Sequence, residues 1–533
     1  MTDTFAIELT DIDKRFGAVH ANNKVCLQVK RGNIHGIIGE NGAGKSTLMS
    51  ILYGFYQADG GQINVLGETY TFTDSHHAIA AGIGMVHQHF MLVENFTVLE
   101  NVILGSEGGA LLAGGLAAAR KELTRLGEEY GLKVDLDATI DTLSVGLQQR
   151  VEILKALYKG AKILILDEPT GVLTPQETDE LFRIFAALKE QGVTIMLITH
   201  KLREIMSITD QVSVMRAGQM VAHRDTNATN REELAELMVG RKVLLQVNKG
   251  PANVKAPLMN IKRLTIADNQ GVERLKDVSF ELRAGEVLGV AGVSGNGQTE
   301  LLEALAGIVP LTSGSIEVLG MEMDAKNPIA PDVLRKLGLA HVPEDRHRMG
   351  LITDFHASES ALLGYHTDKD INSGIWLSKA KVDANCEQLM QAFDVRPADP
   401  HLKSANFSGG NQQKLILARE MERSPEVLLI GQPTRGVDIG AIEFIHERII
   451  AMRDAGKAVL LVSVELDEIM SVSDRIIVLC DGEITGRINA ADADERTLGM
   501  MMANALEPID PLQTMNDEQQ AHNQKSTEQE AQP

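Results

Sequence analysis

Residues 34–47 read IHGIIGENGAGKST and decide the fold of the first half of the chain. The apolar run at 34–39 leads into the turn Gly39-Glu40-Asn41-Gly42-Ala43-Gly44-Lys45-Ser46-Thr47, and a helical stretch follows. This is the pattern GxxxxGK[ST] between a strand and a helix, in which backbone N–H groups surround a phosphate. We expect Lys45 to reach the β and γ phosphates of a nucleotide and Ser46 to ligate Mg²⁺. A chance glycine-rich turn is disfavoured because strand, turn and helix agree.

A second apolar strand, ILILDEP from Ile163, ends in two acids. Asp167 is predicted to hold Mg²⁺ and Glu168 to orient and polarise an attacking water. Taken alone, an acidic strand end is more often a solvated corner or a helix cap, so its weight comes from following the phosphate turn. Short apolar runs alternate with helical stretches, which predicts an α/β fold with a largely parallel sheet covered on both faces. The runs are residues 34–39, 163–166, 194–199 and 212–215.

The chain contains a long internal repeat. LSVGLQQR at 143–150 is matched by FSGGNQQK at 407–414, and ILILDEPTGVLTP from Ile163 is matched by VLLIGQPTRGVDI from Val427. A second glycine-rich turn begins at Gly292. One α/β architecture is therefore predicted twice in tandem.

The composition excludes several classes of protein. The chain has 533 residues, 44 % hydrophobic and 23 % charged, which is typical of globular proteins with two or more domains. Its formal charge of −22 disfavours nucleic acid as a partner. The three cysteines lie far apart and predict neither a zinc site nor a disulfide framework. No secretion signal is apparent and no stretch approaches about 18 uninterrupted apolar residues, so we expect membrane-spanning helices only in other chains.

Two changes in composition suggest the domain boundaries. The segment QVNKGPANVKAP from Gln246 to Pro257 contains two prolines and a glycine, which favours a connector. We place the boundary near residue 250, with one domain at residues 1–250 and another at 251–508. Beyond residue 508 the chain is rich in Gln, Glu and Asn, which predicts a disordered acidic tail at residues 509–533.

These motifs together resemble the ATP-binding cassette (ABC) family, whose mark is an LSGGQ-like signature segment ahead of the Asp-Glu strand. That segment appears as LSVGLQ at 143–148 and as FSGGNQ at 407–412. The resemblance covers roughly residues 5–505. It implies two tandem P-loop ATPase domains, each with a mainly parallel sheet, an antiparallel β portion and an α-helical subdomain.

The resemblance also implies roles for single residues. Gln88 matches the glutamine that senses Mg²⁺ and faces the membrane subunit. His200 matches the histidine that contacts the γ-phosphate, and Phe16 the aromatic that stacks on adenine. Each has a simpler alternative, since His200 follows a buried strand as a structural histidine would and Phe16 has the character of a core residue.

The second copy has lost its catalytic side chains. Its phosphate turn runs from Gly292 to Gly297, Gln298 and Thr299, and the neutral Gln298 stands in the place of Lys45. An amide still hydrogen-bonds a phosphate but brings no positive charge. We therefore expect no hydrolysis there. The other replacements are Gly431 for Asp167, Gln432 for Glu168, Val464 for His200 and Glu344 for Gln88.

The first copy is altered in its other half-motif. Val145 stands where the second copy has Gly409, and Thr174 where it has Asp438. ABC cassettes pair head to tail, so that each nucleotide lies between the phosphate turn of one and the signature segment of the other. That geometry unites all the intact elements in one pocket and all the altered ones in the opposite pocket. The intact elements are Lys45, Ser46, Gln88, Asp167, Glu168, His200, Ser408, Gly409, Gly410 and Asp438.

Finer resemblance favours the ATPase of a bacterial importer for nucleosides. The implied partners are two permease subunits and an extracytoplasmic solute-binding lipoprotein, and the implied location is the cytoplasmic face of the inner membrane, bound through the permease. The segment from His89 to Leu104, with the helix to about Tyr158, is the expected permease-facing surface. ATPases of ribose- and galactose-type importers remain an alternative, as does a non-transport tandem ABC protein such as a translation factor.

Overall fold

The structure is a computed structural model that divides into two compact units, residues 1–244 and 245–533. It describes residues 5–17, 19–87, 90–105, 112–171, 173–242, 249–293, 295–368, 371–373, 376–437 and 439–504. The predicted tail at 509–533 lies outside the described residues. None of the described helices is both long and apolar enough to cross a bilayer.

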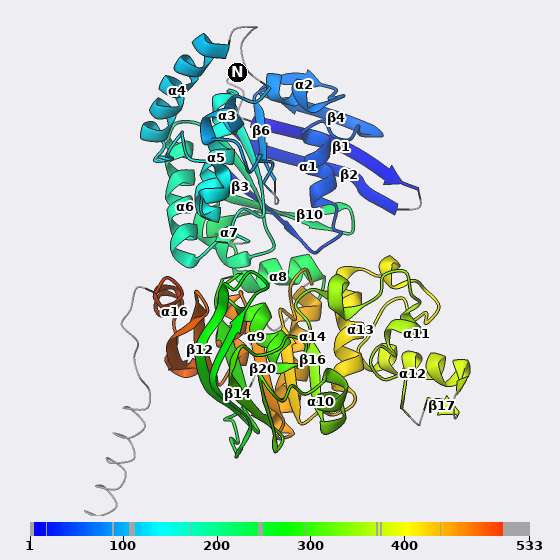
Figure 1. The fold of residues 1–533 in the computed structure, drawn as a ribbon. Helices are drawn as coiled ribbons and strands as arrows, with labels where there is room; N and C mark the ends of the chain where they lie inside the picture. Colours follow the sequence, from blue (N-terminus) through cyan, green and yellow to red (C-terminus); the bar gives the residue numbers. More distant parts are fainter. Residues whose placement is uncertain are drawn as a thin grey trace, which may run out of the picture. The chain divides into compact units, whose positions relative to one another are not determined.

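The first unit contains two sheets (Figure 1). The antiparallel sheet has the order β2 (Val19–Lys30), β1 (Phe5–Phe16), β4 (Gly60–Val65) and β5 (Glu68–Tyr70). The larger sheet has the order β10 (Gln219–Asp225), β9 (Gln211–Arg216), β3 (Ile34–Gly39), β8 (Thr194–Ile198), β7 (Ile163–Asp167) and β6 (Ile83–Val86). All its pairs are parallel except β10 with β9. Strands β3 and β8 are buried along their whole length, as their continuous apolar sequences predict.

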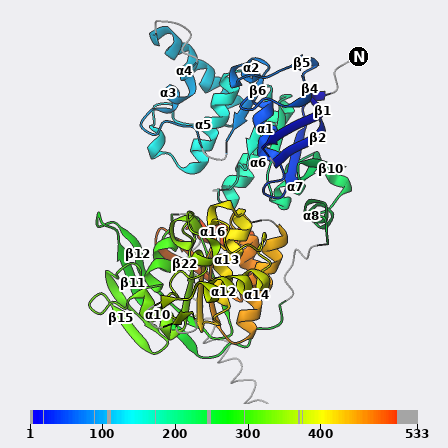
Figure 2. The same ribbon diagram turned by 90° about the vertical axis from the view of Figure 1, so that its right-hand side faces the viewer.

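Helices of the first unit fall into two groups. The helices α3 (Val98–Ile103), α4 (Leu112–Glu129) and α5 (Val145–Tyr158) pack on one another, and both views show them on the side of the unit away from β1 and β2 (Figures 1 and 2). They form the predicted helical subdomain. The others are α1 (Lys45–Leu52), α2 (Ser75–Ala80), α6 (Pro175–Glu190), α7 (Leu202–Ile208) and α8 (Arg231–Val239).

The second unit repeats this topology strand for strand. Its antiparallel sheet is β12 (Glu273–Arg283), β11 (Pro257–Ala267), β14 (Ser313–Val318) and β15 (Met321–Asp324). Its larger sheet is β22 (Glu483–Asn489), β21 (Arg475–Cys480), β13 (Val287–Ala291), β20 (Ala458–Ser463), β19 (Val427–Gly431) and β16 (Leu339–Val342). A small hairpin joins β17 (Asn372–Ser373) to β18 (Trp376–Leu377). The prediction of two tandem α/β domains is confirmed.

The helices of the second unit follow the same plan. Of these, α12 packs against both α11 and α13, which makes the second helical subdomain. The helices are α9 (Gln298–Leu305), α10 (Pro331–Leu337), α11 (Ala357–Ser360), α12 (Lys379–Ala392), α13 (Gly409–Met421), α14 (Ile439–Asp454), α15 (Leu466–Val472) and α16 (Glu495–Met502).

A buried histidine gives the first unit a pH-dependent stability. His35 in β3 is 2 % exposed, and its Nε2 lies 2.7 Å from Ser213 Oγ, which lies 2.8 Å from His223 Nδ1. Burial lowers the pKa of His35 to about 4, helped by the charges of His223 and Lys30 and opposed by Asp210. The unfolded chain binds this proton near pH 6.5. Folding is therefore not opposed by this histidine above pH 6.5, where it is neutral in both states. As the pH falls from 6.5 toward 4, only the unfolded chain takes up the proton, so the unfolding free energy decreases.

We expect this histidine to cost the unit about 2 kcal/mol of unfolding free energy between pH 7 and pH 5. The variant His35→Leu reproduces the Leu288 found at the same place in β13 and removes the titrating group. Urea unfolding of both proteins at the two pH values checks this. Between pH 7 and pH 5 the unfolding free energy of the original chain should fall by about 2 kcal/mol more than that of His35→Leu. An equal fall in both proteins would contradict the prediction.

Candidate active site

The phosphate turn of the first unit connects the end of β3 to the start of α1. Gly44 caps α1 with φ 99°, a conformation that favours glycine, and a Cβ there would lie 2.2 Å from Ala21 O. Asn22 Nδ2 donates to Gly44 O at 3.1 Å and holds the turn against the antiparallel sheet. The turn therefore presents its backbone N–H groups at the start of a helix, where an anion is stabilised.

Lys45 is folded back onto this turn. Its Nζ donates to Gly39 O at 2.6 Å and to Glu40 O at 3.1 Å, and the residue is only 7 % exposed. Burial lowers its pKa, while the nearby carboxylates of Glu168 and Asp167 act in the opposite direction. The Lys45 ammonium is thus a buried cation near the carboxylates of Glu168 and Asp167.

The two acids at the end of β7 lie in different environments. Glu168 Oε1 accepts a hydrogen bond from His200 Nδ1 at 2.7 Å. Burial raises the pKa of Glu168, but the hydrogen bond from His200 and the charges of His200 and Lys45 outweigh burial, so the pKa of Glu168 is lowered. Burial and the charge of Glu168 raise the pKa of Asp167 to about 6. Glu168 therefore has the lower pKa of the two acids, and His200 orients its carboxylate.

The residues present fit a divalent cation. Asp167 accepts no hydrogen bond from the residues that the structure describes, and its raised pKa means that a further positive charge would stabilise its ionised form. Ser46 is exposed next to Lys45 at the start of α1. A carboxylate and a hydroxyl are oxygen ligands of the kind Mg²⁺ prefers.

Glu168 has a backbone conformation that is uncommon for its residue type. Its φ is 48°, and its N–H donates to Ile198 O at 2.8 Å. Gln432 in the second unit has the same φ of 48° and the equivalent bond to Val462 O at 2.8 Å. Both units thus keep the same strained backbone conformation at this position, but only the first unit has a carboxylate there.

Phe16 lies on the surface and is not a core residue. It is 43 % exposed at the end of β1 and makes an edge-to-face contact with Tyr56, with ring centroids 5.2 Å apart. Sequence reasoning missed Tyr56, because no motif marks it. The two rings form an exposed aromatic pair suited to stacking on a base.

The equivalent turn in the second unit is occupied by its own side chains. Glu344 accepts hydrogen bonds from Thr299 Oγ1 and, at 3.3 Å, from Gln432 Nε2. Gln298 is 2 % exposed, and its Nε2 has no hydrogen-bond partner among the described residues. The side chains that would face Mg²⁺ therefore bond to one another.

Gly431 explains why this pocket has no second acid. A Cβ at this position would lie 2.6 Å from Glu344 Cγ and 2.7 Å from Leu302 Cδ1. A side chain at position 431 would therefore require Glu344 or Leu302 to move from its present position.

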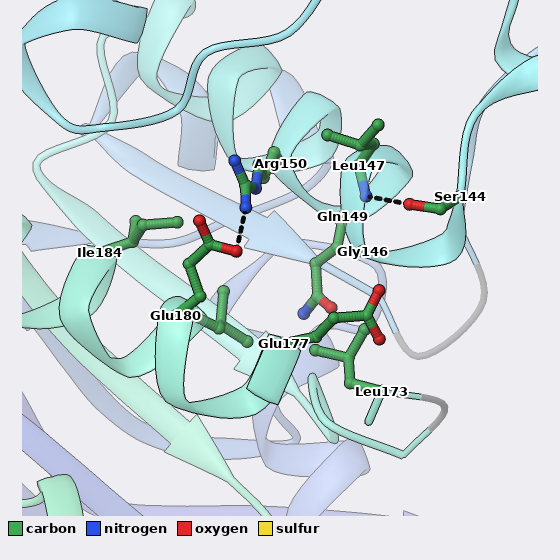
Figure 3. A pocket seen from close by; sticks show the side chains of 10 residues that line it. Ser144, Gly146, Leu147, Gln149, Arg150, Leu173, Glu177, Glu180 and Ile184 are labelled. Atoms are coloured by element: carbon green, nitrogen blue, oxygen red, sulfur yellow. Dashed lines mark hydrogen bonds and ion pairs between the residues drawn. The ribbon is translucent and has the colours of Figure 1, made fainter. Parts of the chain in front are cut away.

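The signature segment of the first unit begins α5 (Figure 3). Ser144 caps this helix by accepting from Leu147 N at 3.4 Å, and Arg150 pairs with Glu180 of α6 at 2.5 Å. Figure 3 shows Gln149 pointing into the pocket between α5 and α6. Val145, at the altered signature position, is 39 % exposed, so the first unit presents an apolar side chain to solvent where the second unit has Gly409.

Where the second copy has Asp438, the first unit has Thr174, which caps a helix. Thr174 caps α6 in a reciprocal arrangement in which Thr174 Oγ1 accepts from Glu177 N at 3.3 Å and Glu177 Oε2 accepts from Thr174 N at 2.9 Å. This residue therefore has a structural partner within its own unit.

The signature segment of the second unit keeps its open start. Ser408 caps α13 and accepts from Asn411 Nδ2 at 2.8 Å, and Gly409 and Gly410 follow as the first residues of the helix. Two predicted site residues, Gln88 and Asp438, lie outside the described residues.

Sequence reasoning also missed a buried carboxylate behind His200. Glu204 accepts hydrogen bonds from Thr170 and, at 3.2 Å, from Thr199 Oγ1. Thr199 Oγ1 in turn accepts from Lys201 N at 3.0 Å. This network fixes the loop that carries His200 to the loop after Glu168. A helical glutamate four residues beyond a motif gives no sequence signal.

Comparison with known proteins identifies the class. A family model for the ABC transporter family matches residues 22–171 and 275–435. The chain therefore belongs to the ABC transporter family, and the prediction made from the two signature segments is confirmed.

Relatives match over almost the whole chain. The chain is 46 % identical over 502 residues to the nucleoside import ATP-binding protein NupA of Lactococcus lactis subsp. cremoris, covering 94 % of this chain and 99 % of that protein. It is 45 % identical to the guanosine import ATP-binding protein NupO of Bacillus subtilis, covering 94 % and 98 %. It is 38 % identical to the ribose import ATP-binding protein RbsA of Lactococcus lactis subsp. cremoris, covering 92 % and 98 %.

One solved structure resembles the entire tandem fold. The archaeal ribosome recycling factor aABCE1, in complex with the ribosomal stalk protein aP1, matches with a TM-score of 0.56 over 88 % of this chain and 87 % of that chain. The sequences are 22 % identical, so the likeness concerns the fold alone.

Proposed function

We propose that this chain is the ATP-hydrolysing subunit of a nucleoside importer. The observation that carries the proposal is its 46 % and 45 % identity, over nearly its full length, to two proteins named for nucleoside and guanosine import, against 42 % and 38 % for proteins named for glucose and ribose import. In this role the chain lies on the cytoplasmic face of the membrane and is attached through two permease subunits. A separate solute-binding lipoprotein delivers the cargo outside.

The first unit supplies the hydrolytic machinery. The turn from Gly39 to Thr47 and Lys45 hold the β and γ phosphates of ATP, with Phe16 and Tyr56 beside the adenine. Ser46, Asp167 and Gln88 hold Mg²⁺, which neutralises charge on the phosphates. Glu168 orients the attacking water and accepts its proton, since it is ionised and held by His200.

The second unit completes this nucleotide site through its signature segment. Ser408, Gly409, Gly410 and Asp438 contact the same ATP from the opposite side, so that binding closes the two cassettes and hydrolysis releases them. The supporting observation is the distribution of replaced residues: this pairing places every catalytic replacement in the other pocket. That pocket, around Gln298 and Gln432, does not hydrolyse ATP.

Exposed apolar side chains of the first unit mark the proposed permease contact. Met91 is 62 % and Leu104 44 % exposed, and Phe55 is stacked on His87 with centroids 5.7 Å apart. Met85, by contrast, is buried at 9 % exposure. An apolar, adaptable surface of this kind suits a helix from a partner.

The experiment reconstitutes the chain in proteoliposomes with the permease and lipoprotein encoded beside its gene. We expect guanosine or another nucleoside to stimulate ATP hydrolysis, while ribose and galactose leave it unchanged. Stimulation by a monosaccharide alone would replace the nucleoside proposal with the sugar-importer alternative. ATP hydrolysis that needs no permease and responds to ribosomes would instead favour a translation factor.

A further inference from the structure

The second unit contains a short segment that the first unit lacks. Lys155 and Arg419 occupy equivalent positions in the signature helices of the two units. Lys155 donates a hydrogen bond to Met91 O and Arg419 donates one to Gly350 O, each at 2.8 Å, so Met91 and Gly350 correspond. Glu344 precedes Gly350 by six positions, whereas its counterpart in the first unit precedes Met91 by three. The second unit has therefore gained three residues at this point.

The longer segment forms a capped turn that is fastened to α13. The carboxylate of Asp345 accepts from His347 N at 2.9 Å and from Arg348 N at 3.0 Å. His347 Nε2 lies 2.9 Å from Gln412 Oε1 on the first turns of α13. These contacts hold Arg346 beside the start of the signature helix.

The guanidinium of Arg346 lies against the signature glycine. A Cβ on Gly409 would lie 2.8 Å from Arg346 Nη2, and Arg346 Nη1 donates to Arg435 O at 3.0 Å. Both Nη atoms lie 3.5 Å from the Cβ position of Gly436. The guanidinium therefore lies between the signature segment and the turn after β19, and in this position it would be in close contact with any side chain at position 409.

This cation has no carboxylate partner among the residues that the structure describes. Its Nε is shielded from solvent and makes no hydrogen bond there, and the acid next to it, Asp345, is engaged by backbone N–H groups. Burial, together with the charge of Arg435, lowers the pKa of Arg346, while the charge of Asp345 acts in the opposite direction. The Arg346 cation beside the start of a 13-residue helix makes a local positive field that favours an anion.

We propose that Arg346, together with the start of α13, binds the terminal phosphate of a nucleoside triphosphate. This inference rests on the proposed function, in which Ser408 faces the nucleotide held by Lys45. A planar guanidinium offers paired N–H groups to phosphate oxygens, which an ammonium cannot match. ADP lacks the terminal phosphate, so Arg346 discriminates ATP from ADP. A purely structural brace would not discriminate between them.

The test measures binding of MgATP and MgADP to the full chain in the Glu168→Gln background, which prevents turnover. We expect Arg346→Met to weaken ATP binding about 10- to 100-fold and to leave ADP binding unchanged. Arg346→Lys should bind ATP more tightly than Arg346→Met but less tightly than the chain with Arg346. Arg348→Met is the matched control, because this arginine is exposed on the same turn and we expect it to change neither affinity. Thermal melting confirms that each variant folds.

The outcomes separate this inference from the proposed function. Equal weakening of ATP and ADP by Arg346→Met, or no weakening, overturns the phosphate contact. If Ser408→Ala selectively weakens ATP and Arg346→Met does not, the shared nucleotide site stands and only the role of Arg346 fails. If neither variant affects ATP, the shared site itself is refuted, and the inference fails with it.

Discussion

Replacing Glu168 with glutamine is expected to lower ATP turnover on the order of 100- to 10 000-fold while ATP still binds. The change keeps the size of the side chain but removes the group that accepts a proton from water. His200 Nδ1 retains an acceptor in the amide oxygen, so the local geometry survives. Steady-state phosphate release and equilibrium ATP binding measure the two effects separately.

The second unit provides the matched control for this prediction. Gln432 has the backbone conformation of Glu168 but bonds to Glu344 inside a pocket that we infer to be inactive. We expect Gln432→Ala to leave turnover within about twofold of the original chain. Near-normal turnover in Glu168→Gln, or a large loss in Gln432→Ala, would refute the assignment of the hydrolytic site.

Replacing Lys45 with glutamine is expected to weaken MgATP binding by about 10- to 100-fold, since a charge-assisted hydrogen bond to phosphate becomes a neutral one. The variant imitates the Gln298 found naturally in the second unit. The change also removes the cation that lowers the pKa of Asp167, which burial already raises to about 6. We therefore expect the remaining activity to need a higher pH, because Asp167 must be ionised to hold Mg²⁺.

Titration with a fluorescent ATP analogue measures the affinity, and steady-state phosphate release at several pH values measures the pH dependence of the remaining activity. Gln298→Ala serves as the comparison, and we expect it to leave the high-affinity site unchanged. An unaltered affinity in Lys45→Gln would mean that the phosphates are held by backbone N–H groups alone. That result would contradict the role of Lys45 in binding the phosphates.

The sequence predicted the fold well because its signals are local. The run IHGIIG at 34–39 became β3, ILIL at 163–166 became most of β7, and both strands end where the motifs begin. Fully buried parallel strands need continuous apolar residues, and a phosphate turn needs glycines at fixed spacing. The family assignment followed from the order of these local patterns.

The sequence could not predict features that depend on packing between distant segments. Tyr56 joins Phe16, and Glu204 ties Thr170 to Thr199, without any motif to mark them.

By itself, the sequence determined that this chain contains two cassettes, because the order and spacing of their motifs are local features. Residue type at the motif positions also predicts which side chains keep catalytic chemistry. Tertiary structure alone decided how the altered positions are used. It showed that Glu344 occupies the space that a side chain at position 431 would need, and that Arg346 lies on Gly409 without a carboxylate partner among the described residues. The reason is physical: excluded volume and charge pairing act between atoms that are close in space, whatever their separation along the chain.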